Sequence, residues 1–281
     1  MLFLCTVLLE PSRDPHVRSH HEPVTDAHRL LAAFGVVLPT GLELGPGSGA
    51  EALAPFIVQA EQPSSNTLGD VHVGRFGLRS ASAPDASAAQ TRHCRVETMK
   101  SNPMFRQSWW AGRRCVIPVE RLTEWCCAAG RPGMWHIGPA DEAPMGLAGL
   151  WNTWTSPTGE TQGSFCVLTL DGTGHAVFDG LKHPTHEKRM PVILPTQAQQ
   201  PWLHGTGAQA ERLLVPFPAE QLQTRPVDPA GDSAQLAWPD AADLFADDWW
   251  GLVAEAPRKK RVVVRRPPSI VPLPVTGDLF A

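Results

Sequence analysis

The spacing of glycine and proline constrains the fold of this chain more than any other feature of its sequence. The 281 residues include 24 Gly and 28 Pro, which interrupt the apolar runs and keep them short. Apolar residues follow a helical spacing at residues 27–37, with a stop signal at Gly35, and a second short helix is expected at residues 103–110. The other apolar runs have the lengths and residue types of strands: 54–59, 71–78, 114–118, 134–137, 145–154, 164–170 and 191–194. The sequence therefore predicts an α+β fold, with a β-rich domain, a barrel-like sheet and few short helices.

The composition changes near Pro226. From Asp228 to Glu255 there are seven acidic residues and no Lys or Arg, and a basic block at residues 258–266 follows. A Pro-rich segment with separated blocks of opposite charge is typical of disorder. We therefore predict a folded domain at residues 1–226 and a disordered acidic and basic tail at residues 227–281.

The six cysteines follow no regular spacing and include no Cys-x-x-Cys pair, so neither a metal site nor a disulfide framework is expected. The apolar start of the chain lacks a basic segment before it and is ended by Glu10-Pro11, unlike a secretory signal. No apolar stretch reaches the roughly 20 residues that cross a bilayer. We expect a cytoplasmic, nucleoid-associated bacterial protein without a membrane partner.

Three segments in a fixed order carry a more specific signal. Residues 93–98 read His-Cys-Arg-Val-Glu-Thr, residues 114–125 contain Arg-Cys-Val-Ile-Pro and Leu-Thr-Glu-Trp, and residues 183–194 end in Lys-Arg-Met-Pro-Val-Ile-Leu. In these segments the chain resembles the SRAP family (SOS response-associated peptidase-like proteins), where the matching stretches read Asn-Ala-Arg-x-Glu-Thr, Arg-Cys-Leu-Val-Pro with Tyr-Glu-Trp, and Lys-Arg-Met-Pro-Val-Ile-Leu. The resemblance extends over residues 5–217 and implies a SRAP-like domain fold.

The resemblance also implies covalent sensing and shielding of abasic sites in single-stranded DNA. In the family, an N-terminal cysteine supplies its α-amine and its thiol to the aldehyde of the opened abasic sugar. The amine forms an imine and the thiol then closes a thiazolidine ring, so both groups must belong to one residue. An α-amine with its ordinary pKa near 8 is partly unprotonated at physiological pH. Cys5 is the nearest candidate in this chain, and no cofactor is implied.

Glutamate and histidine side chains would move protons or orient the sugar. Glu124 matches the family's glutamate, which would protonate the sugar oxygen and the carbinolamine; the alternative is an exposed carboxylate at a strand end. His183, with His186 as its alternate, is the candidate for a second proton carrier, against a surface histidine in a polar loop. His93 stands where the family has Asn, and it can donate a hydrogen bond to the cysteine or the sugar.

Basic and aromatic residues beside the three segments are expected to bind the DNA strand. Guanidinium groups suit phosphate oxygens, and indole rings can stack on unpaired bases. For the first two arginines below, the alternative is a structural salt bridge, for instance with Glu97, and for the tryptophans it is a place in the core. The expected DNA-binding residues are Arg95, Arg189, Arg113, Arg114, Trp109 and Trp110.

The N-terminus departs from the family, because Leu2 stands where the reactive cysteine belongs. We therefore expect the functional protein to begin at Cys5, either through translation from the Leu4 codon or through removal of Met1–Leu4 by the protein itself. In the alternative, Leu2–Leu9 is an ordinary buried strand and Cys5 is a core thiol.

Two other functions remain open. Cys5 with His183 and Glu124 would also suit a thiol peptidase that cleaves itself or other chains. A chain without the reactive terminus would be a non-catalytic single-stranded DNA binder. In the tail, two Asp-Leu-Phe segments, at 243–245 and 278–280, resemble the peptides with which bacterial repair proteins dock on the replication sliding clamp.

Overall fold

The structure is a computed structural model that describes residues 19–39, 53–61, 67–79, 88–126, 133–155, 159, 161–181 and 187–227. The chain divides into two units, Met1–Asp232 and Ser233–Ala281. The described residues all belong to the first unit. Apart from Val227, the predicted tail with its charged blocks and Asp-Leu-Phe segments lies outside the described residues, and so do Cys5, His183 and His186.

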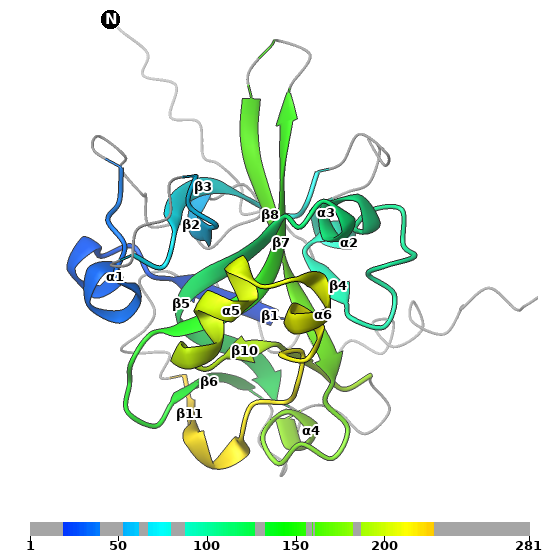
Figure 1. Cartoon of the computed structure of the whole chain (residues 1–281). Coiled ribbons are helices and arrows are strands. Elements are labelled where there is room, and N and C mark those ends of the chain that lie inside the picture. The colour runs from blue at the N-terminus through cyan, green and yellow to red at the C-terminus, as the bar shows by residue number, and fades with distance from the viewer. Residues whose placement is uncertain are drawn as a thin grey trace, which may run out of the picture. The chain divides into compact units, whose positions relative to one another are not determined.

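Five strands form a closed barrel, which confirms the predicted β-rich fold with a barrel-like sheet (Figure 1). They pair in the order β7–β8–β3–β2–β5, and β5 pairs back with β7. The β3–β8 pair is parallel, and the other pairs of the ring are antiparallel. The strands are β2 (Leu53–Val58), β3 (Asp70–Phe76), β5 (Arg114–Cys126), β7 (Met145–Thr155) and β8 (Thr161–Asp171).

Gly74 and Gly163 lie opposite each other where β3 and β8 run parallel. A Cβ atom on Gly74 would collide with the carbonyl of Gly163, and a Cβ on Gly163 would come within 2.9 Å of the Val73 carbonyl oxygen. The close approach of these two strands therefore requires glycine at both positions.

Shorter strands extend the sheet around the barrel. Two of them, β4 and β9, both pair with β8, β10 pairs with β7, and β1 pairs with β5. Beyond β5 the sheet continues through β6 to β11. These strands are β1 (Ser19–Pro23), β4 (His93–Arg95), β6 (Gly133–Pro139), β9 (Arg189–Pro191), β10 (Ile193–Leu194) and β11 (Leu222–Pro226).

Two sequence predictions need correction. The strand expected at residues 114–118 continues to Cys126, so it carries Glu124 within the sheet. The strand expected at residues 191–194 is divided into β9 and β10, because its two halves pair with different strands. Val192 lies between them; its N–H donates to Leu168 on β8 and its carbonyl accepts from Ala148 on β7.

The helices are short, as predicted, and most of them pack on the outside of the barrel. The helix expected at residues 27–37 is α1 (Ala27–Phe34), which begins with an Asp26 cap and ends at Gly35 in the left-handed conformation. The others are α2 (Ala88–Thr91), α3 (Arg106–Trp110), α4 (Phe178–Leu181), α5 (Thr196–His204), α6 (Gly207–Glu211) and a 3₁₀ turn at Ala219–Gln221.

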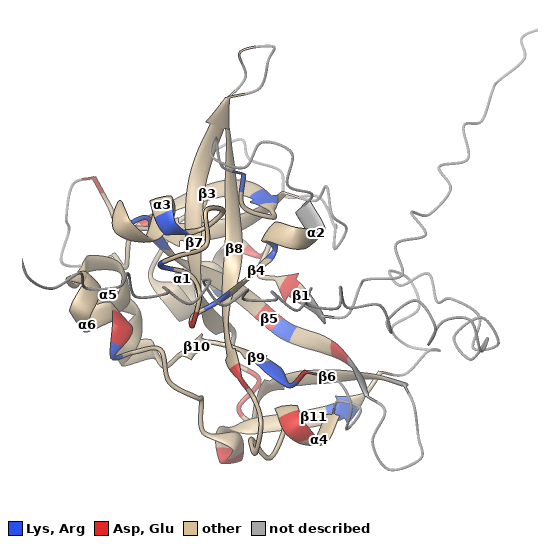
Figure 2. Ribbon diagram, turned by 90° about the vertical axis from the view of Figure 1, so that its right-hand side faces the viewer, with Lys and Arg blue, Asp and Glu red and all other residues tan. Residues whose placement is uncertain are grey.

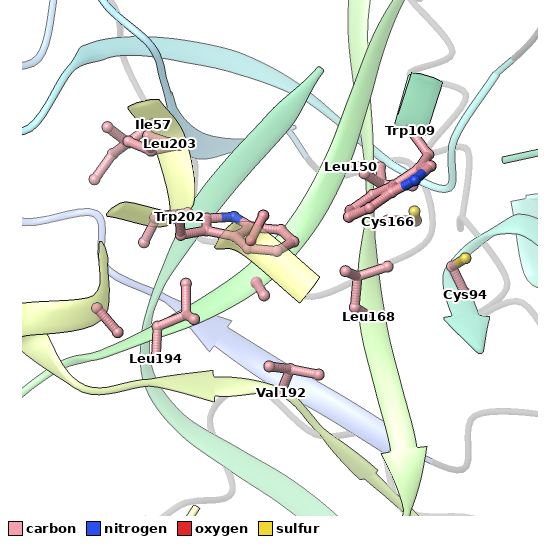
Figure 3. Close-up of a cluster of buried hydrophobic side chains, with 14 of the residues drawn as sticks. Ile57, Cys94, Trp109, Leu150, Cys166, Leu168, Val192, Leu194, Trp202 and Leu203 are labelled. Atoms are coloured by element: carbon pink, nitrogen blue, oxygen red, sulfur yellow. The ribbon is translucent and has the colours of Figure 1, made fainter. Parts of the chain in front are cut away.

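Alternate residues of the barrel strands form two separate cores. Phe56, Ile117, Leu147 and Phe165 belong to the cluster that fills the barrel. One sequence neighbour of each belongs to the outer cluster, to which several helices contribute: Ile57, Val116, Ala148 and Cys166. In the outer cluster, Trp202 of α5 is fully buried, and its indole N–H donates to the Cys115 carbonyl at 2.9 Å (Figure 3).

Candidate functional site

The described candidate residues centre on β4. This strand runs parallel to β8 and places His93 opposite Val167 and Arg95 opposite Thr169. Cys94 between them is fully buried, so the alternation of the strand directs His93 and Arg95 to the exposed face. Local pairing with β8 therefore brings the predicted hydrogen-bond donor and the predicted phosphate ligand to one surface.

Arg189 reaches the same stretch of β8 from β9. Arg189 lies opposite Asp171, and its guanidinium donates to the Thr169 carbonyl at 2.6 Å and to the Thr169 hydroxyl at 3.2 Å. It also forms a two-point ion pair with Glu97, at 3.0 and 2.9 Å. The alternative predicted for this arginine, a salt bridge with Glu97, is thus present in the structure.

Arg95 is also ion-paired. Its guanidinium donates to the Glu187 carboxylate at 2.6 Å, and Glu187 lies 3.9 Å from Arg189. Figure 2 shows basic and acidic residues side by side at β9. Both predicted phosphate ligands are therefore occupied by carboxylates of the protein.

The ion pairs differ in how firmly they are held. The hydrogen bond from Arg189 holds the pKa of the Glu97 carboxyl below its ordinary value, against the opposing effect of burial. Side chains of Arg95 and Glu187 are both about half exposed, at 57% and 49%, whereas that of Arg189 is 17% exposed. The Arg95–Glu187 pair is therefore the more accessible to water and to a ligand.

Aromatic rings connect His93 to β1. The Phe76 ring lies 5.5 Å from His93 and 4.5 Å from His21, both in edge-on geometry, and it stacks on Phe165 at 5.6 Å. The Arg92 guanidinium lies over the same ring at 5.7 Å. Phe76 thus fixes the position of His93 relative to β1, which is paired with β5.

Glu124 lies on β5 between β1 and β6. Its neighbours across the strands are Ser19 and Trp135, and only 4% of the residue is exposed. The alternative of an exposed carboxylate at a strand end is therefore wrong, because pairing on both sides of β5 buries this position. A carboxyl group held in place by strand pairing on both sides is a candidate proton donor or acceptor.

Two of the predicted DNA-binding residues are corrected by their burial. Arg114 is 7% exposed and donates to the carbonyls of Trp202 at 2.6 Å, Leu203 at 3.4 Å and Gly205. Burial lowers its pKa. Trp109 is 3% exposed and packs 6.4 Å from the Trp202 ring (Figure 3). Both side chains hold α3 and α5 against the barrel and do not face a ligand.

Arg113 and Trp110 remain accessible. Trp110 is 69% exposed, and its indole N–H donates to the Lys100 carbonyl at 3.3 Å. Arg113 is half-buried, donates to the side-chain oxygen of Asn152 and lies over the Trp151 ring at 5.9 Å. These two candidates stay in the proposed DNA interface.

The buried thiols are poor nucleophiles. Cys94, Cys115 and Cys166 are fully buried free cysteines. A hydrogen bond with Cys166, together with burial, raises the pKa of the Cys94 thiol, and burial raises that of Cys115. None of these three suits the role predicted for Cys5.

In the described part of the chain, no group of three or more His, Cys, Asp or Glu side chains is arranged to hold a metal ion. No helix among the described residues is long and apolar enough to cross a membrane.

Known proteins resemble this chain in sequence and in fold. The family model for the SOS response associated peptidase (SRAP) matches residues 49–232. The abasic site processing protein HMCES of Xenopus tropicalis is 28% identical over 168 residues, which are 51% of this chain and 48% of the relative. The mouse protein of that name is 25% identical over 195 residues, or 58% and 53% of the two chains. The chain thus spans about half the length of the curated relatives it matches.

Solved structures share the fold. A crystal structure of a Bordetella bronchiseptica protein superposes with a TM-score of 0.66 at 27% identity, covering 75% of this chain and 99% of that one. A Bacteroides thetaiotaomicron protein has a TM-score of 0.61 at 24% identity, with 74% and 91% covered.

Proposed function

The chain belongs to the SRAP family, and we propose that it processes abasic sites in single-stranded DNA, in the response to DNA damage, by bonding to them covalently. The observation that carries this proposal is the arrangement on β4, where His93 and Arg95 share the exposed face beside Arg189. The names of the vertebrate relatives support abasic-site processing as the reaction.

The proposed reaction joins the abasic aldehyde to a cysteine that begins the mature chain. The α-amine of Cys5 adds to the aldehyde carbon, and loss of one water gives an imine. The thiol sulfur then bonds to the same carbon, and the thiol proton goes to the ring nitrogen. The product is a thiazolidine that holds the DNA without any change in oxidation state.

Glu124 is proposed as the acid that protonates the sugar oxygen during ring opening and the hydroxyl that leaves as water. His93 donates a hydrogen bond to the sugar or the cysteine, where the family has Asn. His183, or His186 in its place, is proposed as a second proton carrier. Arg95, Arg189 and Arg113 would bind phosphates, and Trp110 would stack on a base.

The test uses a single-stranded oligonucleotide with one abasic site, followed by a denaturing gel. A stable band of protein plus DNA supports the proposal. Binding that is lost on denaturation supports a non-catalytic DNA binder, and peptide cleavage without DNA supports a thiol peptidase. Duplex with the same site should react more slowly, because the strand must be unpaired to reach the site.

We also propose that the tail tethers the domain to the replication machinery of the bacterial nucleoid, through the Asp-Leu-Phe segments at 243–245 and 278–280 and the basic block between them. A chain that ends at Pro226 should lose retention on the sliding clamp in a pull-down. Equal retention of the full and shortened chains would disprove this tether.

A further inference from the structure

We propose that Arg79, Arg113, Asn152 and Trp154 form a second contact surface for single-stranded nucleic acid, here called the Arg–Trp surface. Its arginines would bind phosphate and Trp154 would stack on a base. This inference rests on the proposed function, because it describes where the strand continues beyond the reacting sugar.

Asn152 organises the surface from within β7. This residue is 6% exposed; its amide oxygen accepts from the Arg113 guanidinium, and its amide nitrogen donates to the Arg79 carbonyl at 2.8 Å. Ser164 on β8 adds a second link, since its hydroxyl accepts from the Arg79 N–H at 3.0 Å and donates to the Asn152 carbonyl at 3.2 Å. Two arginines distant in sequence are thereby held on one rigid frame.

Both guanidiniums lie over indole rings. The Arg79 guanidinium is 4.9 Å from the centre of the Trp154 ring, and that of Arg113 is 5.9 Å from Trp151. Arg79 is exposed and Trp154 is half-buried. A guanidinium stacked on an aromatic face keeps its N–H groups in its own plane, where they can still donate to phosphate oxygens.

The Arg–Trp surface also lacks the counter-charges of the β4 site. Within the described part of the chain, neither Arg79 nor Arg113 contacts a carboxylate, whereas Arg95 and Arg189 are paired with Glu187 and Glu97. A phosphate approaching Arg95 must displace a carboxylate, whereas among the described residues no carboxylate competes for Arg79. Within that part of the chain, positive charge without a paired carboxylate therefore lies at the Arg–Trp surface.

The Arg–Trp surface and the β4 site both lie next to the C-terminal end of β3. Arg79 follows Phe76 by three positions, and Ser164 precedes Phe165, the ring on which Phe76 stacks. Phe76 in turn contacts His93. In the proposal, a strand whose abasic sugar lies at His93 continues past the end of β3 toward Trp154.

The first test measures binding of a fluorescent oligo-dT strand without an abasic site, over a series of salt concentrations. Arg79→Gln should weaken binding and reduce the slope of log K against log salt by about 0.7, the value for one phosphate contact on a single strand. Arg225→Gln is the matched control, because it removes the same charge from an exposed residue of β11, beyond β5 and β6 in the sheet. Its slope should equal that of the wild type.

The second test reports stacking directly. A strand containing 2-aminopurine loses fluorescence when that base stacks on an indole. Trp154→Leu should reduce this quenching, leaving only the part due to Trp110, and weaken binding about 5-fold or more, and Trp154→Phe should restore most of the affinity. Circular dichroism melting curves identify any variant that is not folded. The Arg79 side chain donates no hydrogen bond within the described residues, so Arg79→Gln keeps the frame intact.

Several results would overturn the inference. An unchanged slope in Arg79→Gln, or an equal loss in Arg225→Gln, would show that the Arg–Trp surface makes no specific phosphate contact. If either of these results is found and the wild type still crosslinks abasic DNA, the inference fails and the proposed function stands. If the wild type neither binds oligo-dT nor crosslinks, the inference and the proposed function fail together.

Discussion

The Glu187 carboxylate lies 2.6 Å from the guanidinium of Arg95 and 3.9 Å from that of Arg189. One acidic side chain thus faces both arginines that are proposed to bind DNA phosphates at the β4 site. A phosphate and a carboxylate use the same guanidinium donors, so they compete for them. Glu187 should therefore limit the affinity of this site for DNA.

Replacing Glu187 with Gln should strengthen binding to oligo-dT. An exposed ion pair is worth about 0–1 kcal/mol, and removal of a repelling charge adds to the gain, so we expect roughly 2- to 10-fold tighter binding at low salt. Fluorescence anisotropy measures this change. Glu120→Gln makes the same charge change at the Arg29–Glu120 pair on α1 and β5, and it serves as the control. Equal effects of the two variants would show that Glu187 affects binding only through the net charge of the protein.

Glu124→Gln should slow crosslinking of the abasic strand while DNA binding stays nearly unchanged. A general acid or base contributes about 10²–10⁴-fold to a rate, and Gln keeps the shape of the buried side chain without its proton. The rate is followed on denaturing gels over time. Glu120→Gln, on the same strand, should react at the wild-type rate. Wild-type kinetics in Glu124→Gln would remove this residue from the mechanism.

Arg114→Met should destabilise the domain. The substitution leaves the carbonyls of Trp202, Leu203 and Gly205 without their buried donor. Each unsatisfied buried group costs about 1–3 kcal/mol, so the three carbonyls together predict a loss of at least about 3 kcal/mol in the free energy of unfolding. Urea denaturation measures this loss, and Arg225→Gln should change it little. A variant of unchanged stability that binds DNA poorly would restore Arg114 as a DNA contact.

The Glu97–Arg189 pair predicts a dependence of stability on acid. Because Arg189 holds the pKa of Glu97 below its ordinary value, the pair stabilises the fold fully above the ordinary glutamate pKa of about 4.3. That contribution is lost as the pH falls from there through the lower, folded pKa. The Glu97 side chain is 48% exposed, so the effect is about 1 kcal/mol or less. Glu97→Gln should flatten the acid side of the stability curve, and a curve parallel to that of the wild type would contradict the prediction.

A chain that begins at Cys5 should form the stable adduct, and a chain that keeps Met1 should not. The thiazolidine needs a terminal amine beside the thiol, and an internal Cys5 has none. Intact-mass measurement of the native protein and of the adduct decides this. In a chain that begins at residue 5, Cys5→Ser keeps the amine, so it should give only an imine that borohydride can trap. A crosslinking protein that retains Met1 would disprove the proposed start.

The sequence by itself was enough to locate the barrel strands, because their alternation and their Gly and Pro boundaries are local properties. It did not predict the short strands β1, β4 and β11, which depend on pairing with β5, β8 and β6. The helix at residues 27–37 was predictable for the same reason, since Asp26 and Gly35 cap it locally. Helix α5 was not predicted, because its few apolar residues are interrupted by Pro201 and its stability comes from Trp202 buried against the barrel. Local propensity is a weak guide where tertiary packing provides the stability.

The sequence also determined which residue types flank the SRAP segments. It therefore determined which side chains are candidates for binding the DNA phosphates and the abasic sugar. Only the tertiary structure decided among them, because burial and pairing depend on strands distant in sequence. Neighbouring residues such as Arg113 and Arg114 look alike in the sequence. In the structure Arg114 begins β5 and donates to α5, whereas Arg113 precedes the strand and donates to Asn152. Because β4 and β9 pair with the same stretch of β8, Glu187 lies beside Arg95. This ionic contact depends on which strands pair, and strand pairing is decided by the tertiary structure.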